Sequence, residues 1–136
     1  MTGDPTAVAP VRSVQAARTA TRDAVSGLRR LLRTWIREDG LHPDLAEDVV
    51  LAVDEAVTNV VEHAYPGQCG EVRLRLARSA PGELEVTVED DGTWRPPPED
   101  PGFRGRGVQL IHGLADRARI THSPRGTTVS MCWDAS

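Results

Sequence analysis

The pattern of hydrophobic and polar positions divides the chain into a helical first half and a stranded second half. Apolar residues recur every three or four positions from Val14 to Glu38 and again from Pro43 to about Ala64. This spacing is typical of amphipathic helices that pack on a core. Asp39-Gly40 separates the two helices. Residues 1–12 carry no periodic pattern, so we expect a flexible leader there, with room for a short edge strand around Val8 to Val11.

Beyond the helices, polar and apolar residues alternate with the period of half-buried strands. Short segments rich in Gly and Pro separate these runs and indicate turns, so consecutive strands are expected to pair as antiparallel hairpins. The predicted elements of this second half are a strand, a strand, a helix, a strand and a strand, at Glu71–Ala77, Leu84–Glu89, Val108–Leu114, Ala118–His122 and Thr127–Trp133.

This order of elements predicts the fold class. Helices grouped before strands favour an α+β fold, a two-layer α/β sandwich with helices on one face of a mixed, mostly antiparallel sheet. A doubly wound nucleotide-binding fold would need strictly alternating strands and helices, and that alternation is missing here. We therefore expect one domain over residues 13–136, without internal repeats.

Charge and composition narrow the class of protein. The net charge of −4 argues against a nucleic-acid partner, because such surfaces carry a basic excess. The sequence has neither an apolar run of about 20 residues for a membrane span nor a signal-peptide pattern. Cys69 and Cys132 stand far apart, which argues against a zinc site or a disulfide framework. We expect a cytoplasmic protein without a membrane partner.

The second predicted helix carries a polar stripe beside its apolar one. Glu55, Asn59, Glu62 and His63 stand three or four residues apart, so their side chains share a face. An Asn carbonyl is a suitable ligand for a hard cation such as Mg²⁺, and a Glu carboxylate can take a proton from an attacking hydroxyl. Taken alone, such a stripe is more often the solvated edge of a core helix.

Three glycine-marked sites follow the polar helix. Asp90-Asp91-Gly92 ends a strand, where a carboxylate can accept a hydrogen bond from the amine of adenine. Gly105-Arg106-Gly107 precedes the third helix, whose first N–H groups can meet phosphate oxygens. Gly126-Thr127 opens the last strand. Each is an ordinary turn or loop when considered singly.

Their order along the chain is far more specific. The series E-x-x-x-N on a helix, D-x-G after a strand, G-x-G before a helix and G-T-T before a final strand resembles the GHKL ATP-binding superfamily, with its histidine-kinase-like ATPase fold. The segment D-E-A-V-T-N-V-V-E-H-A-Y, ending at Tyr65, looks most like bacterial anti-sigma-factor serine-protein kinases. The resemblance covers about Val14 to Trp133.

The resemblance implies a function, its cofactors and its partners. It implies an anti-sigma factor that is also an ATP- and Mg²⁺-dependent kinase, acting on a Ser or Thr of an anti-anti-sigma (STAS) protein and binding a sigma factor. Relatives of this kind are often homodimers, and the sequence leaves the oligomeric state open. The matched positions are Glu55 as general base, Asn59 as Mg²⁺ ligand, Asp90 and Gly92 as adenine site, Gly105 and Gly107 as phosphate loop, and Thr127 in the adenine pocket.

Two departures leave an alternative open. Many relatives read D-x-G-x-G, whereas Thr93-Trp94 follows Gly92 here, and the segment from Thr93 to Arg104 is short and rich in Pro. These features favour a nucleotide-regulated or nucleotide-free adaptor that only sequesters its partner. A sensor histidine kinase domain is a third interpretation, but the first predicted helix contains no His to accept a phosphoryl group.

Overall fold

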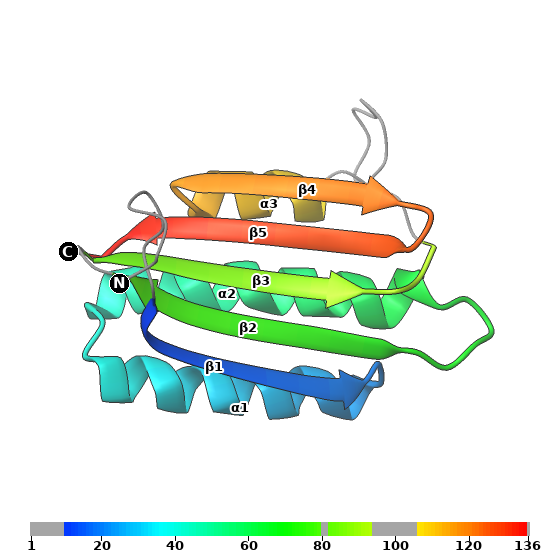
Figure 1. Ribbon diagram of the computed structural model, residues 1–136, viewed down its shortest axis with the longest axis horizontal. Coiled ribbons are helices and arrows are strands. Elements are labelled where there is room, and N and C mark those ends of the chain that lie inside the picture. The colour runs from blue at the N-terminus through cyan, green and yellow to red at the C-terminus, as the bar shows by residue number, and fades with distance from the viewer. Residues whose placement is uncertain (1–9, 80–81, 94–105, 136) are drawn as a thin grey trace, which may run out of the picture.

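The described part of the chain forms a five-stranded sheet that is covered on one face by helices (Figure 1). The computed structural model describes residues 10–79, 82–93 and 106–135. The elements, in chain order, are β1 (Pro10–Thr19), α1 (Arg22–Asp39), α2 (Pro43–Asn59), the π-helical turn η1 (Val60–Ala64), β2 (Glu71–Ser79), β3 (Glu83–Asp90), α3 (Arg106–Leu114), β4 (Arg117–Ser123) and β5 (Gly126–Asp134).

The five strands lie in the order β1-β2-β3-β5-β4. Every pairing between these described strands is antiparallel, so the sheet is antiparallel rather than mixed. β5 follows β4 in the chain yet lies between β3 and β4, in the interior of the sheet. Helices on one face of this open sheet confirm the predicted two-layer α+β fold.

The core lies between the sheet and the helices, and α2 lies between α1 and α3 in this layer (Figure 1). Alternate residues of the inner strands point into it, which gives the two-residue period seen in the sequence. Aliphatic side chains fill most of this space. The largest fully buried side chains of any type are Trp133, Leu28, Leu32, Leu74, Leu76, Leu84, Ile111 and Met131.

The predicted first helix was wrong over its first eight residues, because residues 14–19 belong to β1 and α1 starts at Arg22. Apolar residues here fit both the helical and the strand period, and pairing with β2 decides between them. Val14 lies opposite Leu76 and Ala16 opposite Leu74, and both are partly buried against the core. The helix begins only after Thr21, whose backbone is extended. Residues 1–9 of the predicted leader lie outside the described part of the chain.

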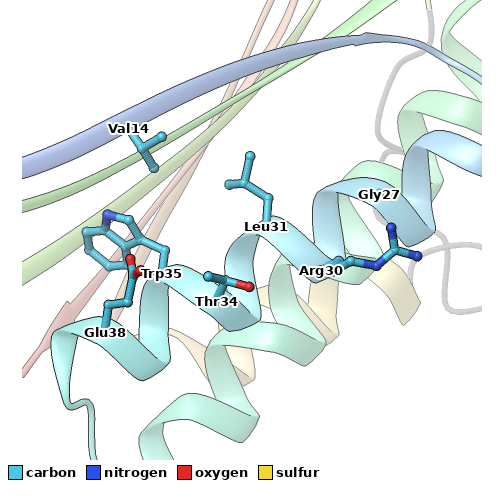
Figure 2. A pocket seen from close by; sticks show the side chains of 7 residues that line it. All are labelled: Val14, Gly27, Arg30, Leu31, Thr34, Trp35 and Glu38. Carbon is cyan, nitrogen blue, oxygen red and sulfur yellow. The ribbon is translucent and has the colours of Figure 1, made fainter.

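Side chains of α1 contact β1 and hold this strand against the helix layer. Leu31 and Trp35 point toward Val14 across a groove of about 410 Å³ (Figure 2). The guanidinium of Arg12 lies 4.6 Å from the centroid of the Trp35 ring and also donates a hydrogen bond to the Trp35 carbonyl at 3.1 Å. The aromatic face and the carbonyl together hold the cation, which fixes the outer strand on the first helix.

Candidate nucleotide site

Three polar side chains occupy one level of three neighbouring strands. The ladder places Asp90 of β3 opposite Thr127 of β5, and Thr127 opposite His122 of β4. Asp90 is 3% exposed and Thr127 is 1% exposed, and they are the two buried polar residues in the described core. We call this level the polar row. Burying a carboxylate is costly unless it is hydrogen-bonded, so such a row in an otherwise aliphatic core marks a candidate binding site.

The turn after β3 holds the Asp90 carboxylate in place. The N–H of Gly92 donates to Asp90 Oδ1 at 2.8 Å. The next N–H, of Thr93, donates to the carbonyl of Ala64 at 2.8 Å, which joins the turn to the end of η1. A Cβ on residue 92 would lie 2.1 Å from that carbonyl oxygen. The close approach that requires glycine here is therefore made to the end of η1.

The adjacent carboxylate points elsewhere. Asp91 is exposed, and both of its oxygens accept hydrogen bonds from Arg73, at 2.8 and 3.0 Å. This ion pair lowers the pKa of Asp91 below its ordinary value. Of the two adjacent aspartates, Asp90 is therefore the buried one, and it stands at the position that the D-x-G spacing predicts for the adenine site.

Tyr65, the only tyrosine in the sequence, joins three segments around this turn. Its hydroxyl donates to the carbonyl of Glu71 at 2.6 Å and accepts from the N–H of Asp91 at 2.8 Å. Its ring packs on Gly70, where an added Cβ would lie 2.1 Å from ring carbons. Sequence reasoning missed this role, although a lone tyrosine directly after a polar helix was a usable signal.

The polar stripe of α2 ends close to the same turn, because α2 continues into η1 and η1 contacts Gly92. Glu55 and Asn59 are both half-buried and stand one helical turn apart. Burial raises the pKa of Glu55, the neighbouring Glu62 and Asp54 raise it further, and His63 lowers it. Glu55 is therefore a stronger proton acceptor than an ordinary glutamate.

Of the other residues predicted from the sequence, the structure describes His63 and Gly107 but not Gly105. His63 is exposed, and its Nε2 lies 3.8 Å from Glu62 Oε1, a weak contact. Gly107 is the second residue of α3, whereas Gly105 lies outside the described residues, so the phosphate loop stays a prediction. At the other end of α3, Trp133 Nε1 donates to the carbonyl of Leu114 at 2.8 Å and fixes the helix on β5.

Residues 18–133 match the histidine kinase-like ATPase domain. The chain belongs to this family. A serine-protein kinase RsbW from Bacillus cereus (strain AH187) is 29% identical over 127 residues, which cover 82% of this chain and 78% of the relative. A second RsbW, from Bacillus thuringiensis (strain Al Hakam), is 32% identical over 107 residues, which cover 68% of this chain and 66% of the relative.

Other members of the family are larger. Blue-light-activated histidine kinase 2 of Erythrobacter litoralis (strain HTCC2594) is 34% identical over 65% of this chain, which spans only 27% of that protein. The crystal structure of the RsbU and RsbW domains of a Mycobacterium tuberculosis protein has a TM-score of 0.73 and 26% identity over 92% of this chain, which spans 33% of the solved chain. The resemblance to GHKL anti-sigma-factor kinases is confirmed. No helix in the described part of the chain is long and apolar enough to cross a membrane.

Proposed function

We propose that this protein is an ATP-dependent serine/threonine kinase that phosphorylates an anti-anti-sigma (STAS) partner and, as an anti-sigma factor, binds a sigma factor. The observation that carries the proposal is Glu55, a half-buried carboxylate of raised pKa, one helical turn from Asn59. Their helix continues into η1, whose Ala64 carbonyl accepts a hydrogen bond from Thr93 in the turn that holds Asp90. Similarity to RsbW serine-protein kinases supports the same reaction.

The residues of the polar row fit an adenine base. An ionised carboxylate only accepts hydrogen bonds, so buried Asp90 favours a ligand that presents a donor. The exocyclic amine of adenine is such a donor, whereas guanine presents a carbonyl at that position. The Thr127 hydroxyl at the same level adds a second polar contact.

The helix residues fit the transfer step. When bound, ATP would supply the phosphoryl group, and Mg²⁺ would neutralise the negative charge of the phosphates. Asn59 would hold the cation through its side-chain oxygen. Glu55 takes the proton from the Ser or Thr hydroxyl of the partner, and its raised pKa suits a base that works near neutral pH.

A transfer assay tests the proposal. With radiolabelled ATP and candidate STAS proteins, Glu55→Gln should bind ATP but lose transfer by about 100-fold or more, the usual contribution of a general base. Glu47→Gln is the matched control, because Glu47 lies on the same helix but is exposed and does not contribute to the raised pKa of Glu55. Wild-type transfer by Glu55→Gln would overturn the assignment of the base.

The adaptor without kinase activity makes the opposite prediction. It would bind its protein partner while showing no nucleotide binding in a calorimetric titration at millimolar ATP with Mg²⁺. The comparisons do not favour it, because the relatives are named as kinases.

A further inference from the structure

The outer strand β1 leaves one edge of the sheet open to a further strand. It pairs with β2 on one side, and no other described strand pairs with it on the other. The outward N–H and C=O groups of such an edge are a template for pairing. β1 is ten residues long, and its middle, Ser13–Ala17, carries no charge. The opposite edge strand, β4, has seven residues and includes exposed Arg117 and Arg119. Because charged side chains discourage edge pairing, β1 is the better template.

The groove between Val14, Leu31 and Trp35 runs beside this open edge, and we call it the α1 groove (Figure 2). Its lining on α1 recurs every three or four residues from Gly27 to Glu38, so it follows one face of the helix. This stripe is about 16 Å long, which is the length of about five residues of a strand. Val14 and Leu31 are only partly buried against the core. The groove therefore offers apolar surface to a strand added beside β1.

The charged residues of the α1 groove differ in their partners. Glu38 Oε1 lies 2.9 Å from Nη2 of Arg12. Arg30 is exposed and makes no ion pair or hydrogen bond within the described part of the chain. Arg33 and Arg37 are also exposed, so this side of α1 is basic. The groove therefore favours a ligand that brings a carboxylate to Arg30.

We propose that the β1 edge and the α1 groove bind an extended, acidic segment of a partner protein, which adds to the sheet as a further strand. The backbone of the segment pairs with β1, alternate apolar side chains fill the groove, and a carboxylate meets Arg30. A second copy of this chain fits less well. Antiparallel pairing of β1 with β1 around a two-fold axis brings the two α1 helices side by side, and each carries five Arg but three acidic residues.

This surface is separate from the candidate nucleotide site. β2 lies between β1 and β3, the strand that carries Asp90. Binding at β1 is therefore expected without nucleotide, and the inference does not rest on the proposed kinase activity.

Fluorescence anisotropy with two labelled peptides tests the proposal on the full chain. In the first peptide, Glu-Thr-Val-Thr-Val-Thr-Glu, one face of the strand carries the Val and Glu side chains and the other face carries Thr. The second peptide has Lys in place of both Glu residues. The glutamate peptide should bind without nucleotide, and about three- to tenfold more tightly than the lysine peptide.

A reversal of charge on the protein tests the contact with Arg30. In Arg30→Glu the preference should reverse, so that the lysine peptide binds more tightly. Arg33→Glu is the matched control, because it makes the same change of charge on the same helix but is not among the residues that line the groove. It should still prefer the glutamate peptide. Both positions are exposed, so both variants should fold.

Methylation of the peptide backbone distinguishes strand addition from simple attraction of charges. Alternate residues of an added strand direct their N–H groups toward β1, and the others direct them away. N-methylation of one alternate set should abolish binding, whereas N-methylation of the other set should leave it. If both methylated peptides bound as the parent does, no strand would be added and the proposal would be wrong.

Two further outcomes would also overturn the proposal. One is that the glutamate peptide shows no binding at millimolar concentration. The other is a dimer in analytical ultracentrifugation that excludes the peptide, which would assign the edge to a second copy of the chain. The proposed function is tested separately by the titration with ATP, because the peptide assay contains no nucleotide.

Discussion

Replacing Tyr65 with Phe would isolate the hydroxyl that joins η1, β2 and the turn after β3. Phe keeps the ring on Gly70 and removes two hydrogen bonds, to the Glu71 carbonyl at 2.6 Å and from the Asp91 N–H at 2.8 Å. Each is worth about 0.5–1.5 kcal/mol, so their sum is about 1–3 kcal/mol. Both partner residues are exposed to solvent, so hydrogen bonds to water replace part of the lost stabilisation. We therefore expect a decrease near the lower end, about 1 kcal/mol, in the free energy of unfolding.

Urea denaturation measures that decrease, and calorimetry measures the affinity for ATP. Tyr65→Phe should also weaken ATP binding, because the turn that carries Asp90 loses one of its ties to the helix end. Arg73→Met is the control, since it breaks the exposed pair with Asp91 but keeps both hydroxyl contacts. The reasoning would be refuted if Tyr65→Phe changed neither stability nor affinity, or if Arg73→Met weakened ATP binding more.

Three further variants test the site. Asp90→Asn should weaken ATP binding and lower its preference over GTP by about five- to 100-fold, whereas Asp91→Asn should change little because its ion pair is exposed. Calorimetry that showed the reverse would place the adenine site one residue away. Glu55→Gln should be more stable than the wild type at neutral pH. The folded-state pKa of Glu55 is raised, so its contribution to stability is full below its ordinary pKa and is lost as the pH rises through the folded-state value. Thermal unfolding against pH should show the two proteins diverging as the pH rises, and a less stable variant would contradict the burial of Glu55. Gly92→Ala should lose about 1–3 kcal/mol in urea denaturation, because its Cβ meets the Ala64 carbonyl, whereas Gly27→Ala, with open space around it in α1, should be neutral or slightly stabilising. Equal effects of these two substitutions would contradict the close approach at Gly92.

The hydrophobic pattern predicted most elements because each buries one face in a regular way. β2 to β5 agree with the sequence to within a few residues, and the helical segment ends at Ala64 as predicted, although its last part forms the π-helical turn η1 and not α-helix. β1 could not be predicted in the same way. The spacing of its apolar residues fits a helix as well, and the deciding interaction is a ladder with β2, whose residues come more than fifty positions later.

Prediction of the candidate site was limited in the same way, because local sequence patterns do not reveal contacts between distant segments. The D-x-G spacing, which is local information, selected Asp90 and not Asp91 for the adenine site. Asp90 is buried and Asp91 is exposed, and the role of Asp90 stays a prediction. Tyr65 and His122 act through contacts between segments, so no motif assigns either of them a role. His122 was nonetheless within reach of sequence reasoning, because a tight turn at Pro124-Arg125 pairs it with Thr127.

The position of β5 has a consequence for how the protein is made. Asp90 and His122 lie on β3 and β4, which are not neighbours until β5 enters between them. β5 is also synthesised after the other described strands. On the ribosome, a nascent chain can therefore have β1 to β4 and the described helices exposed to the cell without the proposed base-binding pocket. Nucleotide can stabilise the chain only after Thr127 has left the exit tunnel, so ATP should act as a ligand of the finished domain and not as a guide to its early folding.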